Sequence, residues 1–119
     1  MMTIEDIQKN QNLIDAIDWE MTPEEAVRLY LEWGNNWTRG NYVIRSSKDV
    51  THYFVVNTWE KTPIIYLIRR NSEDYEELAQ IELPKALRER FLESIGHNKG
   101  VYCLEGEVKH WLQNQLNEI

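Results

Sequence analysis

The stretch VTHYFVVNTWEKTPIIYLIRR, residues 50–70, decides the fold. It contains two runs rich in β-branched and aromatic residues, separated by the segment EKTP, which has the length and composition of a hairpin turn. Pro63 fits the start of the second run, where a missing N–H does least harm to a sheet. The sequence therefore predicts two antiparallel strands, VTHYFVVNTW and IIYLIRR.

Both faces of these predicted strands carry apolar side chains, because the side chains of a strand alternate between its two faces. One face of the first strand holds Phe54 and Val56, and the other holds Tyr53, Val55 and Trp59. The second strand alternates in the same way along residues 64–68. A sheet that is apolar on both faces needs cover on both, from helices or from a partner chain.

Helices are predicted before this hairpin. Thr3 can cap a first helix, whose apolar residues continue at helical spacing to Ile17. The sequence TPEE then places Thr22 at the cap of a second helix, with Pro23 at its first position and Glu25 able to reach back to the Thr22 amide. After this helix, NYVIRS predicts a short edge strand.

The second half of the chain contains one ambiguous segment. NSEDYEELAQIELP, residues 71–84, fits either a helix from Ser72 to about Gln80 or a fourth strand, and the acids crowded after Ser72 favour the helix. Pro84 then begins a helix that Gly96 ends, VYCL is a short extended segment that could add a strand, and EGEVKHWLQNQLNEI is a last helix. The prediction is one α+β domain over residues 1–119: a three- to four-stranded antiparallel meander packed by four or five helices.

The segment LEWGNNWTRGNY is the first candidate binding site. Gly34 suits the left-handed end of a helix, with Trp37 folding back on the last turn, and this interpretation explains most of the segment. The alternative is a ligand surface for a small molecule or a carbohydrate. In that case the indoles of Trp33 and Trp37 stack on the ligand, while Asn36 and Arg39 supply directed hydrogen bonds.

Arg69 and Arg70 form the second candidate site, for an anion such as phosphate. If a helix begins at Ser72, its first amides and the two guanidinium groups could meet the same anion. The competing interpretation pairs both arginines with nearby acids. The sequence contains neither of the two standard glycine-rich nucleotide loops.

No residue pattern predicts catalysis, a metal or a cofactor. His97, Cys103 and His110 lack the close pairs of a zinc site, and Cys103 lies in an apolar context that is typical of an inert thiol. Glu107 and His110 have the E-x-x-H spacing of di-iron bundles, but the chain offers no second such pair. His52 lies within a predicted strand and is interpreted as a half-buried, partnered side chain.

Composition narrows the function further. The net charge of −7 argues against a general nucleic-acid binder, although the middle of the chain is more basic than its ends. One cysteine, no signal-peptide pattern and no long apolar run predict a cytoplasmic protein without a membrane segment. Aromatic residues make up 11% of the chain, and some are expected to be exposed at an interface. We therefore expect a small non-enzymatic domain that binds another protein, as an accessory or regulatory subunit or as a homodimer.

Overall fold

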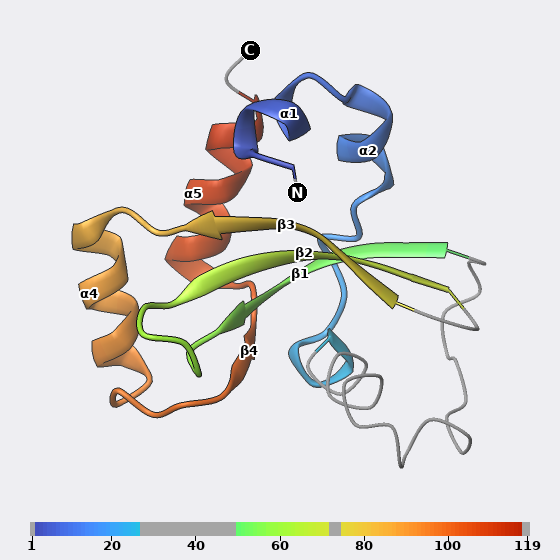
Figure 1. Ribbon diagram of the computed structural model, residues 1–119. Helices are drawn as coiled ribbons and strands as arrows, with labels where there is room; N and C mark the ends of the chain where they lie inside the picture. The colour runs from blue at the N-terminus through green and yellow to red at the C-terminus, as the bar shows by residue number, and fades with distance from the viewer. Residues whose placement is uncertain (1, 27–49, 72–74, 118–119) are drawn as a thin grey trace, which may run out of the picture.

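The computed structural model describes residues 2–26, 50–71 and 75–117, and in this part of the chain the fold is α+β. Its centre is a four-stranded sheet in the order β3-β2-β1-β4, in which every neighbouring pair is antiparallel (Figure 1). The strands are β1 (Val50–Asn57), β2 (Ile64–Asn71), β3 (Tyr75–Glu82) and β4 (Val101–Cys103). The helices are α1 (Ile4–Gln8), α2 (Gln11–Ala16), α4 (Lys85–Ser94) and α5 (Gly106–Asn117).

The predicted hairpin is confirmed as β1 and β2. The two strands pair without interruption from Val50 opposite Asn71 to Asn57 opposite Ile64. The first strand ends two residues earlier than predicted, so Trp59 lies in the turn and not on the sheet face where alternation placed it. The predicted edge strand over residues 41–46 lies outside the described residues, and the meander that the structure shows consists of β1, β2 and β3.

The prediction of a helix up to Gln80 is wrong, because residues 75–82 form strand β3. This strand pairs along β2 with one irregularity, between Leu67 and Ile68 of β2. Ala79 and Ile81 are buried against the core, while Glu76 and Glu82 are exposed. The acids therefore occupy the solvated positions of an edge strand, which is a common way to protect a sheet edge.

The N-terminal helix is capped as predicted but is divided in two. Thr3 accepts a hydrogen bond from the Asp6 amide, and the Asp6 carboxylate accepts one from the Thr3 amide, so a complete capping box begins α1. α1 ends at Gln8, and the Asn10 side chain then accepts a hydrogen bond from the Leu13 amide to begin α2. The polar QKNQN stretch is the site of this break.

Two predicted helices in the second half are confirmed. α4 follows Pro84, and the chain leaves it through Gly96 at φ 66° and His97 at φ 56°. Glycine adopts this left-handed conformation without a steric penalty, whereas histidine does so at a cost. α5 buries Val108, Leu112 and Leu116 along one side. The segment between the two helices supplies the additional strand, β4.

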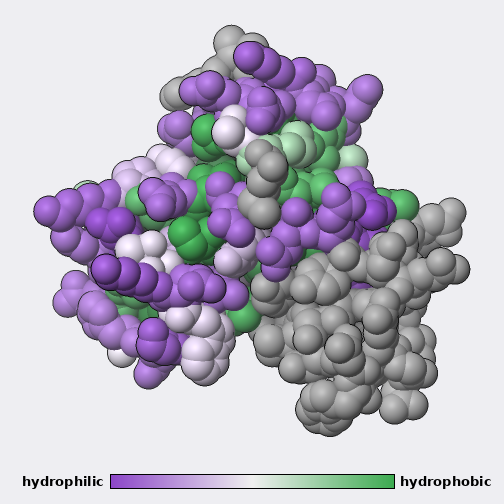
Figure 2. Space-filling view, in the orientation of Figure 1, coloured by the Kyte–Doolittle hydropathy of each residue, from purple (hydrophilic) through white to green (hydrophobic). Residues whose placement is uncertain are grey.

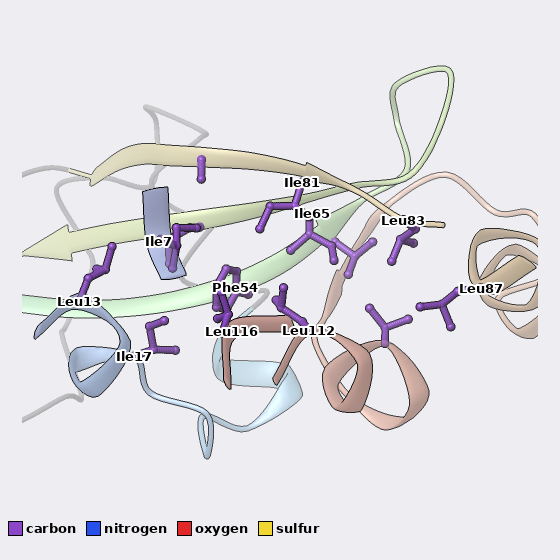
Figure 3. Close-up of a cluster of buried hydrophobic side chains, with 14 residues drawn as sticks. Ile7, Leu13, Ile17, Phe54, Ile65, Ile81, Leu83, Leu87, Leu112 and Leu116 are labelled. Atoms are coloured by element: carbon purple, nitrogen blue, oxygen red, sulfur yellow. The ribbon is translucent and has the colours of Figure 1, made fainter. Parts of the chain in front are cut away.

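The larger core lies between one face of the sheet and the helices (Figure 3). Phe54 and Leu67 are opposite each other in the sheet, and Leu67 is in turn opposite Ala79, so one row of side chains crosses three strands. Ile7 of α1 and Leu112 of α5 pack in the same cluster and are fully buried. Two hydrogen bonds join distant parts of the chain on this side, from the Gln8 side chain to the Gln115 carbonyl and from Lys109 Nζ to the Trp19 carbonyl.

The opposite face of the sheet is also buried, which confirms that both faces need cover. Its cluster comprises Tyr53, Val55, Tyr66, Ile68 and Ala26. Ala26 belongs to residues 23–26, which are helical and lie on this side of the sheet in Figure 1. The predicted cap at Thr22 is present, since its hydroxyl accepts a hydrogen bond from the Glu25 amide. Within the described residues, no helix combines the length and hydrophobicity that a bilayer-crossing segment requires.

Candidate functional site

The first predicted site cannot be placed. Trp33, Asn36, Trp37 and Arg39 lie outside the described residues, as does the helix end at Gly34 that offered the alternative explanation. Both interpretations of that segment therefore stay predictions.

The two arginines of the predicted anion site are neighbours in β2 but have different surroundings. Arg69 lies opposite Glu76 in the sheet, and its Nη2 contacts Glu76 Oε2 at 3.1 Å in an ion pair exposed to solvent. Arg70 is 2% exposed. Side chains of adjacent strand residues point to opposite faces, so the two guanidinium groups do not converge on one point. The first amides of the helix predicted at Ser72 were to complete the site; residues 72–74 lie outside the described residues, and the chain after them is strand β3.

Cys103 is placed in a way that disfavours a nucleophilic role. Burial, with a smaller contribution from the charge of Glu105, raises the pKa of the Cys103 thiol to about 11. A thiol nucleophile acts as the thiolate and needs the opposite shift. Cys103 is therefore a packing residue at the end of β4, at the margin of the second core cluster.

In the E-x-x-H pair on α5, the carboxylate is engaged by a basic side chain. Glu107 instead pairs with Arg90 of α4 at 2.6 Å, and this guanidinium lowers the pKa of the Glu107 carboxyl. His110 is exposed on the same helix. In the described ranges, no three His, Cys, Asp or Glu side chains gather in a way that could hold a metal ion.

His52 lies opposite Arg69 in the β1–β2 ladder and is half-buried, as its position in the sequence predicted. Burial lowers the pKa of its imidazole, and the charge of Arg69 lowers it further. Its main chain is also used by the fold, because the His52 carbonyl accepts a hydrogen bond from the Asp18 amide at 2.8 Å. The residue is thus a structural component of the sheet that prefers the neutral state.

The turn between β1 and β2 presents a large aromatic side chain to solvent. Trp59 is 62% exposed, and the only other large hydrophobic residue exposed in the described residues is Val50. We call residues 58–63 the hairpin tip. The sequence missed this role for Trp59, although NTWEKTP has the composition of a turn and could have indicated it.

The hairpin tip is held firmly at its base. Buried Thr58 donates its amide to the Gly100 carbonyl at 2.9 Å, and its Oγ1 accepts a hydrogen bond from the Gly100 amide at 2.8 Å. The same hydroxyl donates to the Asn98 carbonyl at 3.0 Å. Trp59 itself donates its amide to Asn57 Oδ1 at 2.8 Å. The exposed indole is therefore mounted on a backbone that the loop before β4 fixes in place.

A hollow of about 490 Å³ lies at the outer edge of β3, beside the N-terminal segment. We call it the edge hollow. Its apolar wall is formed by Met2, Ile4, Ile81 and Trp111. In the orientation of Figure 1, the space-filling view shows apolar surface near the centre of the face turned toward the reader (Figure 2). The sequence assigned Trp111 only to the apolar stripe of the last helix.

A second hollow, of about 410 Å³, is lined by residues of α4, α5 and β4. Its apolar wall includes Phe91 and Tyr102, whose rings meet edge to face with centroids 5.8 Å apart. The Arg90–Glu107 ion pair belongs to the same lining.

The sequence matches no protein-family model and no curated protein, and the structure matches no solved structure.

Proposed function

We propose that this chain is a small non-enzymatic domain that binds another protein, as an accessory or regulatory subunit does. The observation that carries the proposal is the exposure of Trp59 on the hairpin tip. Tryptophan is among the residues that contribute most to binding energy at protein interfaces. Its indole combines a large apolar surface with an N–H donor, which suits an interface that is apolar on one side and wet on the other.

The chemistry of the described residues supports a binding role over a catalytic one. The Cys103 thiol is held in its neutral form, and Glu107 is engaged by Arg90.

The one cysteine in the sequence suits a reducing compartment, so we place the protein in the cytoplasm.

The test compares capture of partners by three forms of the full chain: wild type, Trp59→Ala and Val50→Ala. Val50 is the matched control because it is exposed, apolar and located at the far end of β1. We expect wild type and Val50→Ala to retain the same protein from a native lysate, and Trp59→Ala to bind it at least about 10-fold more weakly, the effect of losing about 1.4 kcal/mol.

Thermal unfolding of all three forms checks that they are folded to the same extent. The proposal fails if no protein is retained while light scattering shows a monomer. The binding role assigned to Trp59 is refuted if Trp59→Ala retains the partner as well as wild type does.

A further inference from the structure

We propose that the outer edge of β3 and the edge hollow bind an extended segment of a partner protein, one that carries an apolar side chain next to Lys or Arg. This inference rests on the proposed function, because it names the kind of partner segment that the domain takes. It depends on a different surface from Trp59, so the two can fail separately.

The first argument is the hydrogen-bonding state of the β3 edge. β3 is the last strand of the sheet on this side. Met2 forms a parallel bridge with Ala79, and its amide donates to the outward-facing Leu78 carbonyl at 2.9 Å. Outward-facing residues alternate along a strand, so the main-chain groups of Gln80 and Glu82 face the same way.

The protein's own N-terminal segment leaves this edge after one pairing. Thr3 is the cap of α1, and the helix begins at Ile4, so the chain turns away before it reaches Glu82. Among the described residues, no other strand pairs with the outer side of β3. The Gln80 carbonyl and the Glu82 amide are therefore placed to extend the ladder with one residue of another chain, as in strand addition.

The second argument is that the edge hollow lies at this point of the edge. Its apolar wall is continuous with the main core, because Met2, Ile4 and Trp111 are partly buried against that core, and Ile81 belongs to it. A strand added at Gln80 and Glu82 would alternate its side chains across the edge, so that one of them enters the hollow.

The third argument is charge, and it selects the occupant. Glu82 lines the edge hollow, and an adjoining hollow along the same edge is lined by Asp6 and Glu77 and by Glu76, whose charge is already balanced by Arg69. Of the residues that the structure describes, no Lys, Arg or His lines either hollow. A second copy of this chain, with its net charge of −7, would place carboxylates against carboxylates if it docked by the same edge. A basic segment would instead be attracted to it.

The test selects binders from a display library of random linear decapeptides with the immobilised full chain. We expect the enriched sequences to share an apolar residue flanked by Lys or Arg. Fluorescence anisotropy then measures the affinity of the best peptide for wild type, Glu82→Pro, Glu82→Gln and Glu89→Gln. Proline removes the outward amide that the intramolecular ladder does not use, whereas glutamine removes only the charge.

We expect Glu82→Pro to weaken binding at least about 10-fold and Glu82→Gln to weaken it about 2- to 5-fold, with the smaller effect disappearing at high salt. Glu89→Gln, an equal loss of charge at an exposed position on α4, should leave the affinity unchanged. Circular dichroism and thermal unfolding serve as the control that Glu82→Pro is folded.

Three results would overturn the inference. The first is an enriched set without basic residues, and the second is a peptide that binds Glu82→Pro as tightly as wild type. The third is a dimer of the chain that Glu82→Pro abolishes, since the occupant would then be a second copy. If the partner retained through Trp59 also binds Glu82→Pro undiminished, the proposed function stands and this inference falls.

Discussion

Burial of both faces of the sheet can be tested with two adjacent residues of one strand. Leu67 and Ile68 are both 0% exposed, but they belong to the clusters on opposite faces. Substitution by alanine removes the same number of carbon atoms from each. The lost transfer free energy and the remaining cavity together predict a cost of about 2–5 kcal/mol for either variant.

The assay is equilibrium unfolding in urea of wild type, Leu67→Ala and Ile68→Ala, each as a monomer. A domain of this size is expected to unfold with a free energy of about 5–15 kcal/mol, so a loss of this size is measurable. Equal losses of unfolding free energy would confirm that both faces of the sheet are equally shielded from solvent. A cost below about 1 kcal/mol for Ile68→Ala, beside a full cost for Leu67→Ala, would refute the two-sided packing.

Three further perturbations follow from the same contacts. Thr58→Val should cost about 1–3 kcal/mol in unfolding free energy, because it leaves the partly buried Gly100 amide without its acceptor; an unchanged midpoint in urea would contradict this. The folded pKa of His52 lies below 6.5, so the unfolded chain binds more protons and stability falls as the pH drops through about 6.5. His52→Gln should lose less stability than wild type between pH 7.5 and 5, and parallel pH profiles would count against the assignment. Alkylation of Cys103 by iodoacetamide at pH 8 should be about 100-fold slower than for a thiol with a pKa of 9.0, and unfolding in urea should restore the ordinary rate.

The central hairpin could be predicted because its signals are local. β-Branched and aromatic residues fill β1 and β2, and the turn between them has the right length. β3 could not be predicted in the same way. Its acidic residues resemble those in the first turn of a helix. That helix preference contributes less free energy than the ladder that the segment forms with β2. The alternation through Ala79 and Ile81 was the correct signal.

The candidate surfaces were less accessible to sequence reasoning. Alternation along the predicted strand placed Trp59 on a face of the sheet. In the structure the strand pairing ends at Asn57, so Trp59 lies in the turn and is exposed. The edge hollow combines Met2, Ile81 and Trp111, which are far apart in the sequence. No local pattern reports that these three meet, since their proximity depends on how α1 and α5 pack against the sheet.

The position of α5 also has a consequence for synthesis of the protein. Leu112 and Leu116 fill the core against strands that are translated much earlier, and Gln8 is tied to the backbone of Gln115. A nascent chain whose residues 106–117 are still inside the ribosome therefore exposes the part of the apolar sheet face that α5 covers in the folded protein. The hairpin can fold co-translationally before α5 emerges, but protection of this face against aggregation requires α5.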